Sequence, residues 1–326
     1  MRIAVTRLIP ESGLELLRAE ADVALWPNPL PPGRDEIITL AHGADGLLTL
    51  VTDRVDGALL DALPSVRVVS NYAVGFDNID VPACTARDVA VCTTPDVLTD
   101  ATADYGFTLL LAAARKLIPA VEAARRGDWL TWEPMGFLGQ ETAGRALGVV
   151  GLGRIGAALA RRGHAFGMRI VYTDAVARPE LEQELGAERR ELDALLAESD
   201  FVSVHVPLTP DTVHLIGARE LKLMKPSAVL VNTSRGPVVD NEALADALEQ
   251  GVIWAAALDV TEPEPLPATH RLMHLPNVIV TPHIASATYD TRSEMSILSA
   301  RNVLAVLQGQ EPPRCLNPEV LGRARR

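Results

Sequence analysis

Cysteine is scarce in this sequence. The 326 residues include only Cys84, Cys92 and Cys315, and none of them belongs to a C-x-x-C pair. An odd, dispersed set of thiols does not indicate a disulfide framework, and no group of histidine, cysteine and carboxylate residues has the spacing of metal ligands. We therefore expect thiols without disulfides in a reducing cytoplasm, and no bound metal.

Positive charge is also in short supply. Lysine and arginine total 30 against 42 aspartate and glutamate residues, which gives a net charge of −12. Nucleic acids and anionic membranes both require a basic face, so neither is expected as a partner. An anionic substrate would need a local cationic group.

Long hydrophobic runs are absent. The most apolar stretch, "GFTLLLAAA", is too short to span a bilayer and is flanked by Asp104 and Arg115. The N-terminus "MRIAVTRLIPESG" has the pattern of a strand followed by a helix, not of a signal peptide. We expect a cytoplasmic protein without membrane segments.

Two series of alternating strands and helices fill the chain. In the first 97 residues, short aliphatic runs such as "RIAVT" and "GLLTL" alternate with helical stretches. One long helix is then expected in "TPDVLTDATADYGFTLLLAAARKLIPAVEAARRGDW", with Thr99 or Asp100 as its N-cap. A second alternation begins at "ALGVVG" and contains six candidate strands, and one more helix is expected near 289–308. Such alternation predicts parallel sheets with helices on both faces.

A glycine motif opens the second alternation. Gly151, Gly153 and Gly156 form G-x-G-x-x-G directly after the apolar run "ALGVV". The first glycine permits a tight turn, the second lets a pyrophosphate approach the backbone, and the third lets the helix pack close to the strand. The free N–H groups at the helix N-terminus favour phosphate. We therefore predict a dinucleotide site here.

Asp174 bears on which dinucleotide binds. It ends "RIVYTD", about twenty residues beyond the glycines, where a carboxylate would bind the ribose hydroxyls. A carboxylate there repels a 2′-phosphate and favours NAD over NADP. Arg178 is close enough in sequence to leave NADP open as an alternative.

Three residues that suit acid catalysis follow successive strands. Arg235 ends "SAVLVNTSRG", and its guanidinium can hold a carboxylate through two hydrogen bonds. Glu264 follows the next strand, and His283 follows the last. A histidine can move a proton near neutral pH, and a carboxylate beside it fixes its tautomer. The residues alone leave Glu262 as a competitor of Glu264.

These motifs occur together and in this order in a known family. "NYAVGFDNID", "VVGLGRIG", "SDFVSVHVPLTPDTVHLI", "LVNTSRGPVVD", "AAALDVTEPEPLP" and "VIVTPHIASAT" resemble the NAD(P)-dependent D-2-hydroxyacid dehydrogenases over nearly the whole chain. The chain is most similar to the branch of glyoxylate/hydroxypyruvate reductases. The resemblance implies an α/β protein with two doubly wound parallel-sheet domains. A Rossmann nucleotide domain at 98–284 is inserted in a flavodoxin-like substrate domain built from 1–97 and 285–326, and the active site lies between them.

The resemblance also implies roles for individual residues. His283 would be the general acid, Glu264 its partner and Arg235 the substrate anchor. Substrate contacts would further come from Leu50, Val74, Gly75 and Ser286. The positions that match cofactor contacts, together with the glycines, Asp174 and His283, are Thr102, Arg154, Ile155, Pro207, Thr212, Thr233 and Asp259. His205 ends a strand and is expected to line the same site.

The resemblance leaves the substrate and the assembly open. It implies reduction of a small 2-keto acid and a homodimer in which the segment around 118–145 is exchanged. Gly136 stands where some relatives have a bulky aromatic residue, so the size of the preferred acid is not determined. D-lactate and phosphoglycerate dehydrogenases share the fold. So do corepressor-like proteins that sense the cofactor and retain the same arginine, glutamate and histidine.

Overall fold

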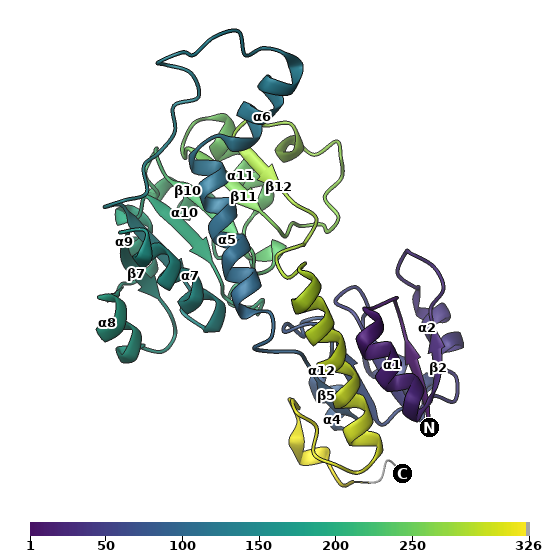
Figure 1. Ribbon diagram of the computed structural model, residues 1–326. Coiled ribbons are helices and arrows are strands. Elements are labelled where there is room, and N and C mark those ends of the chain that lie inside the picture. Colours follow the sequence, from purple (N-terminus) through teal and green to yellow (C-terminus); the bar gives the residue numbers. More distant parts are fainter. Residues whose placement is uncertain (324–326) are drawn as a thin grey trace. The chain divides into compact units, whose positions relative to one another are not determined.

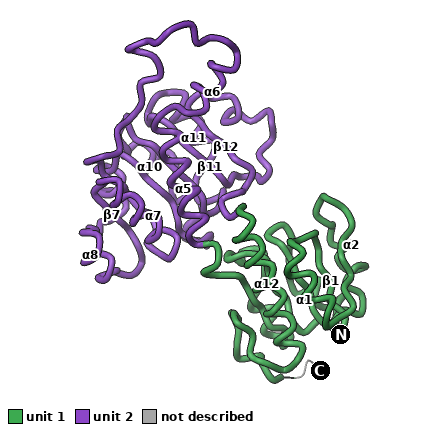
Figure 2. The backbone as a smooth tube through the Cα atoms, viewed as in Figure 1, with its two compact units in different colours: residues 1–98, 287–326 green, residues 99–286 purple. Residues whose placement is uncertain are grey.

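The computed structural model describes residues 1–323, and the chain divides into two compact units (Figure 2). Unit 1 contains residues 1–98 and the segment from 287 onward, whereas unit 2 contains residues 99–286. Both ends of the chain therefore belong to the same unit. Within residues 1–323, no helix is both long and apolar enough to cross a membrane.

Unit 1 is built on a five-stranded parallel sheet. Its strands, in spatial order, are β2 (Asp22–Leu25), β1 (Arg2–Val5), β3 (Gly46–Thr49), β4 (Val68–Asn71) and β5 (Ala90–Cys92). The order 2-1-3-4-5 is that of flavodoxin-like sheets. The predicted fold class of this part of the chain is confirmed.

Helices cover both faces of this sheet because successive side chains of a strand point to opposite faces. They are α1 (Glu11–Glu20), α2 (Arg34–Leu40), α3 (Gly57–Ala62), α4 (Val81–Thr85) and α12 (Tyr289–Leu307), with a short 3₁₀ turn at Pro318–Val320. Leu47 and Val69 face α2, α3 and α4 in one buried cluster. On the other face, Val303 of α12 packs against Gly46, and α12 lies beside α1 (Figure 1).

Unit 2 is built on a seven-stranded parallel sheet. The strands, in spatial order, are β12 (Val278–Val280), β11 (Ala255–Leu258), β10 (Val229–Asn232), β9 (Phe201–Val204), β6 (Ala146–Val150), β7 (Arg169–Thr173) and β8 (Glu188–Arg189). With β6 as strand 1, the order is the Rossmann order 3-2-1-4-5-6 followed by a seventh strand, β12. The six predicted strands are present, and the two-residue strand β8 was not predicted.

Two helical layers enclose this sheet. The helices are α5 (Thr99–Ala114), α6 (Leu117–Arg126), α7 (Arg154–Ala165), α8 (Pro179–Leu185), α9 (Leu192–Glu198), α10 (Ala218–Leu223) and α11 (Asn241–Glu249), and 3₁₀ turns occupy Gly236–Val238 and Arg271–Met273. One buried cluster joins α5, α7 and α8 to the sheet, and a second joins α9, α10 and α11 to its other face. The central strands read as continuous apolar runs because both of their faces are covered.

The long helical pattern that begins at residue 99 forms two helices. Lys116 takes a left-handed conformation at φ 51°, which ends α5 and starts α6. In an unbroken helix the carbonyl of Ala114 would accept a hydrogen bond from Ile118. It accepts one from the N–H of Gln140 instead, at 2.9 Å. The expectation of one long helix was therefore wrong. Pro119 has no N–H to donate to the carbonyl of Arg115, so a continuous helix is interrupted here, and a tertiary hydrogen bond satisfies the Ala114 carbonyl.

Candidate active site

Three adjacent strands bring the predicted acid–base residues to one edge of the unit 2 sheet. Arg235 follows β10, Glu264 follows β11 and His283 follows β12. These strands are parallel neighbours, so their carboxyl ends meet at the same edge. In open α/β sheets this edge is where ligands bind.

His283 and Glu264 are in direct contact. Nδ1 of His283 lies 2.6 Å from Oε1 of Glu264, and the side chains are 31% and 40% exposed. A carboxylate that accepts the Nδ1–H fixes the tautomer and the orientation of the ring. Because Nδ1 is engaged, the proton that a substrate receives would come from Nε2.

The backbone around His283 is held by Asp259. His283 has φ 54°, and its N–H donates to the carbonyl of Asp259 at 2.9 Å. The carboxylate of Asp259 accepts the N–H groups of Ile284 and Ala285 at 2.8 and 2.7 Å and the hydroxyl of Thr281 at 2.7 Å. Asp259 is 1% exposed. A buried carboxylate with bonded neighbours on both oxygens thus fixes the loop that carries the imidazole.

Arg235 is anchored through its backbone and one nitrogen of its guanidinium. Its carbonyl accepts a hydrogen bond from Nδ2 of Asn232, and its Nη1 donates to the carbonyl of Ser234, both at 2.9 Å. The next residue, Gly236, lies so close to Thr261 that a Cβ there would be 1.9 Å from the Thr261 carbonyl oxygen. The loops after β10 and β11 are therefore packed together. A guanidinium can hold a carboxylate through two parallel N–H donors.

The two neighbouring carboxylates take different partners. Glu262 contacts His214, with Oε2 at 2.9 Å from Nε2. Only Glu264 reaches His283. This geometry decides between the two candidates that the residues alone left open.

The glycine turn has the form of a phosphate cradle. Gly151 has φ +92°, which L-residues rarely adopt, and a Cβ on Gly156 would lie 2.1 Å from the carbonyl oxygen of Gly151. By contrast, a Cβ on Gly153 would meet nothing within 4 Å. Open space therefore adjoins the N-terminus of α7, whose first N–H groups have no partner within the helix.

Asp174 lies beside this turn. Its Oδ2 accepts the N–H of Leu152 at 2.8 Å, and its Oδ1 accepts the N–H of Val176 at 3.0 Å. Arg178 approaches the same carboxylate at 3.6 Å, and the Asp174 side chain is 13% exposed. The carboxylate is thus fixed next to the glycine turn. It is paired with Arg178, the cation that left NADP open as an alternative.

The remaining predicted cofactor residues lie around the same edge. They are Thr102 in the first turn of α5, Arg154 and Ile155 at the start of α7, His205, Pro207 and Thr212 after β9, and Thr233 after β10. Thr233 Oγ1 is buried and has no hydrogen-bond partner within residues 1–323. A buried hydroxyl of this kind calls for a ligand. With the open cradle and the fixed carboxylate, it fits a bound dinucleotide.

His205 is desolvated at this edge. Its Nε2 lies 2.8 Å from Oγ of Ser203, and burial lowers the pKa of His205 to about 4. The ring is therefore neutral at physiological pH. A neutral imidazole suits a position beside a cofactor and does not act as a proton donor there.

Unit 1 carries the predicted substrate residues Leu50, Val74 and Gly75, whereas Ser286, expected in the substrate domain, is the last residue of unit 2. Polar side chains that were not identified from the sequence hold the segments of unit 1. Leu50 follows β3, and its N–H donates to Asp53 Oδ2 at 2.8 Å. Gly75, next to Val74, accepts from Asn71 Nδ2 at 2.9 Å through its carbonyl. Asn71 also bonds to Asn78, whose Nδ2 donates to the Leu50 carbonyl at 3.0 Å. The roles of Leu50, Val74, Gly75 and Ser286 in substrate binding stay predictions.

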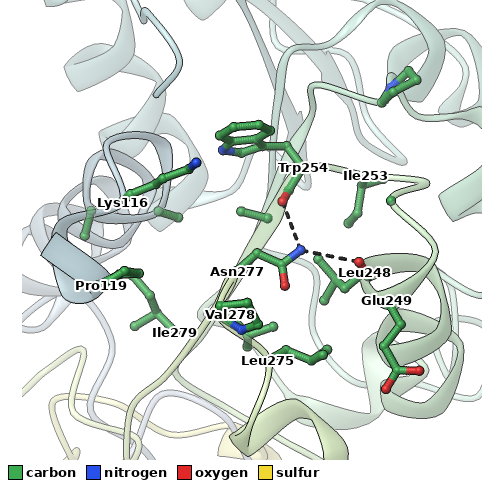
Figure 3. Close-up of a pocket in the computed structure, with 16 residues that line it drawn as sticks. Lys116, Pro119, Leu248, Glu249, Ile253, Trp254, Leu275, Asn277, Val278 and Ile279 are labelled. Atoms are coloured by element: carbon green, nitrogen blue, oxygen red, sulfur yellow. Dashed lines mark hydrogen bonds between the residues drawn. The ribbon is translucent and has the colours of Figure 1, made fainter. Parts of the chain in front are cut away.

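A cavity of about 540 Å³ lies elsewhere in unit 2 (Figure 3). Trp254, Asn277 and Pro226 line it, and they precede β11, β12 and β10. Lys116 lies above the Trp254 ring, 4.6 Å from its centroid. The cavity is therefore at the amino ends of the strands, away from His283. In residues 1–323, no group of three or more His, Cys, Asp or Glu side chains could hold a metal ion.

Comparison with known proteins agrees with this geometry. The family model described as D-isomer specific 2-hydroxyacid dehydrogenase, NAD binding domain, matches residues 107–285. The chain therefore belongs to the D-isomer specific 2-hydroxyacid dehydrogenase family. It is an oxidoreductase that uses NAD(P), and the resemblance seen in the sequence is confirmed.

Curated relatives extend the match to nearly the whole chain. A glyoxylate reductase from Korarchaeum cryptofilum is 49% identical over 98% of this chain and 97% of the relative. A glyoxylate reductase from Thermococcus gammatolerans is 48% identical with the same coverage.

Solved structures share the fold. A protein from Thermus thermophilus has a TM-score of 0.92 at 44% identity and covers 97% of this chain and 100% of its own. An NADPH-dependent glyoxylate/hydroxypyruvate reductase from Sinorhizobium meliloti, in complex with NADP and malonate, has a TM-score of 0.86 at 33% identity and covers 99% and 98%.

Proposed function

We propose that this enzyme reduces glyoxylate to glycolate and hydroxypyruvate to D-glycerate, with NADH as the preferred cofactor. The observation that carries the proposal is the 2.6 Å contact of Glu264 with His283 on the edge that Arg235 shares. The names of the curated relatives, glyoxylate reductase, support the substrate class.

The chemistry follows from the charges at this edge. The glycine turn and Asp174 would hold a reduced nicotinamide dinucleotide, which would supply the hydride for C2 of the keto acid. Arg235 binds the substrate carboxylate and holds the carbonyl in place. His283 donates the Nε2 proton to the carbonyl oxygen as negative charge develops there. General acid catalysis of this kind contributes roughly 10²–10⁴-fold in rate.

Glu264 and Asp259 support the proton donor in different ways. Glu264 stabilises the imidazolium before the proton leaves and keeps Nε2 directed to the substrate. Asp259 fixes the loop through the N–H groups of Ile284 and Ala285. The assignment of Asp259 to the cofactor, made from the resemblance, stays a prediction.

The cofactor preference rests on Asp174. Its carboxylate is held beside the glycine turn by the N–H of Leu152, at 2.8 Å. A fixed negative charge accepts ribose hydroxyls and repels a 2′-phosphate. The pairing of Arg178 with that carboxylate at 3.6 Å reduces the cation's capacity to bind such a phosphate.

We also propose a homodimer. The segment after α6 exposes large apolar side chains, among them Trp129 at 76%, Leu130 at 89% and Trp132 at 79% exposure. Exposed apolar groups in such number mark an interaction surface. Light scattering should give twice the mass of one chain, and a Trp129→Ser/Trp132→Ser variant should give the mass of one.

A cytoplasmic location is proposed on the chemistry of the thiols. No disulfide joins Cys84, Cys92 or Cys315, which all lie within the described residues 1–323. Thiols persist in reducing compartments. Cell fractionation with an antibody to the protein would test the assignment.

The activity is tested by initial rates at the nicotinamide absorbance band, with glyoxylate and hydroxypyruvate, each with NADH and NADPH. Turnover with NADH well above NADPH supports the proposal. Preference for NADPH would overturn the role given to Asp174 but leave the reductase assignment intact. Turnover with D-lactate or phosphoglycerate alone would move the substrate, and no turnover with any acid would favour the corepressor-like alternative.

A further inference from the structure

Two of the three cysteines face each other across an edge of the unit 1 sheet. Cys92 is the last residue of β5, which lies at the end of the sheet order. Cys315, in the segment after α12, pairs with it in an antiparallel bridge. The N–H of Leu316 donates to the carbonyl of Val91 at 2.8 Å, so this ladder bond flanks the cysteine pair. A pair flanked in this way has a Cα separation of about 4.5 Å, and disulfides span roughly 4.4–6.8 Å.

The pair is held in register by groups other than the thiols. Asn317 is 2% exposed, and its Oδ1 accepts the N–H of Val91 at 2.8 Å. Its Nδ2 donates to the carbonyl of Val89 and to the hydroxyl of Thr85, both at 2.9 Å. Arg314 pairs with Asp96 at 2.7 Å. Bringing the two sulfurs together therefore requires little movement of the backbone.

The two thiols differ in reactivity. Cys92 is 0% exposed, whereas Cys315 is partly accessible. The Cys315 thiol donates to Oδ1 of Asn317 at 3.6 Å. The Cys92 thiol beside it lowers the pKa of Cys315 to about 7, and the pKa of Cys92 is raised by the same neighbour and by burial. Cys315 is thus the thiolate that reacts first, and Cys92 is the second thiol beside it. Redox-sensitive sites have this combination of an accessible, acidic thiol and a neighbouring cysteine.

We propose that Cys92 and Cys315 form a reversible redox site, at which a hydroperoxide converts the two thiols to a disulfide that ties the C-terminal segment to β5. The Cys315 thiolate attacks the peroxide oxygen, the O–O bond breaks, and a sulfenic acid forms on Cys315 as hydroxide leaves. The Cys92 sulfur then attacks the Cys315 sulfur, and the S–O bond breaks with loss of water. Two thiols and one hydrogen peroxide give one disulfide and two waters.

The site has a mechanical consequence. A link between residues 92 and 315 encloses all of unit 2 in sequence and crosslinks two distant parts of unit 1. Crosslinks over long loops constrain the unfolded chain most. Thr94, two residues after Cys92, donates its N–H to the carbonyl of Ala73 at 2.8 Å, directly before the Val74–Gly75 segment. Oxidation therefore stiffens the edge of unit 1 next to that segment.

The test uses the full chain, reduced and then exposed to hydrogen peroxide in a series of concentrations. After free thiols are blocked with N-ethylmaleimide, intact mass and peptide mapping identify the products. We expect loss of two hydrogens, a crosslinked pair of peptides that contain Cys92 and Cys315, and recovery of both thiols with dithiothreitol. The oxidised chain should melt at a higher temperature than the reduced chain.

Variants separate the steps. Cys92→Ser should stop at a sulfenic acid on Cys315 that dimedone traps, and its melting temperature should not change on oxidation. Cys84→Ala is the matched control, since it removes the cysteine in α4 and should retain the crosslink. Formation of sulfinic acid on Cys315 of the intact chain without a crosslink would overturn the proposal. So would a disulfide that includes Cys84, or thiols that stay unmodified in the folded chain.

Discussion

Asp259 and Ile284 are joined by a 2.8 Å hydrogen bond from the backbone N–H of Ile284 to the Asp259 carboxylate, directly after His283. The carboxylate lies after β11, and the imidazole lies after β12, so the bond connects the ends of two adjacent strands. It fixes the loop that carries His283, which has a positive φ of 54°. The position of the proposed proton donor therefore depends on a residue that need not touch the substrate.

Asp259→Asn tests this dependence. The asparagine amide has the same shape as the carboxylate. Its NH2 group, however, points at one of the N–H or O–H groups that donate a hydrogen bond to Asp259 in the wild type. We expect kcat to fall about tenfold or more and stability to fall by about 1–3 kcal/mol. Asp200→Asn is the matched control, because Asp200 caps Ala146 at the amino end of the sheet, and should leave kcat unchanged. A destabilised Asp259→Asn variant with normal kcat would argue against positioning.

His283→Gln tests the proton donor. We expect kcat to fall by roughly 10²–10⁴, since general acid catalysis is lost. Binding of NADH, followed by its fluorescence, should be nearly unchanged. The control is His214→Gln. His214 contacts Glu262 in the loop after β11, and this variant should retain kcat. Equal activity of the two variants would rule out the assigned role.

Glu264→Gln tests the partner of the imidazole. The carboxylate accepts the Nδ1–H of His283, so its loss removes a negative charge beside the ring and weakens the hold on the ring's orientation. We expect kcat to fall about tenfold or more, because the proton donor is less well placed. Glu262→Gln makes the same change next to His214 and should leave kcat unchanged. Equal kcat in the two variants would argue against the role given to Glu264.

Asp174→Ser tests cofactor choice. The substitution removes the charge that repels a 2′-phosphate and releases Arg178 from its ion pair. The ratio of kcat/KM with NADPH to that with NADH should rise about tenfold or more, which corresponds to about 1.4 kcal/mol. Glu184→Gln, which breaks the exposed pair with Arg161, is the control and should leave the ratio unchanged. A constant ratio in Asp174→Ser would assign the preference to other residues.

His205 predicts a pH dependence of stability. Burial lowers its pKa to about 4 in the folded chain, below the value of about 6.5 for an unfolded histidine. Above pH ~6.5 both states are neutral. As the pH falls toward 4, only the unfolded chain takes up the proton, so stability is lost, by up to about 3 kcal/mol. Unfolding of His205→Asn should depend less on pH in this window, whereas His42→Asn in unit 1 should follow the wild-type curve.

The sequence alone was sufficient to predict a site residue where the local backbone geometry requires one residue type. Gly151 and Gly156 sit where a positive φ and a close backbone contact require glycine, and both were identified from their spacing. Arg235 and His283 could be assigned to one sheet edge because parallel strands share their direction. The fold class followed from the same alternation.

Contacts between distant residues could not be read in this way. Glu262 and Glu264 are both in the same loop after β11, and only the folded loop sends one to His214 and the other to His283. The hydrogen bond from the N–H of Gln140 to the carbonyl of Ala114 is also a distant contact, whereas the helix break beside it is marked in the sequence by Pro119. The edge strand β8 is two charged residues, Glu188 and Arg189, without an alternating pattern.

Helix α12 makes the order of synthesis matter for unit 1. Its Ser296 packs against Gly13 in α1. The backbone carbonyl of Arg292 accepts a hydrogen bond from the Tyr72 hydroxyl at 2.7 Å. The Asn302 side chain donates to the carbonyl of Thr93. The first 98 residues therefore emerge from the ribosome without the helix that covers one face of their sheet. Unit 2 is contiguous and can fold as it is made, whereas residues 1–98 must wait for residues 289–307. A chain cut short before residue 289 keeps the nucleotide-binding motif and loses the cover of the unit that was synthesised first.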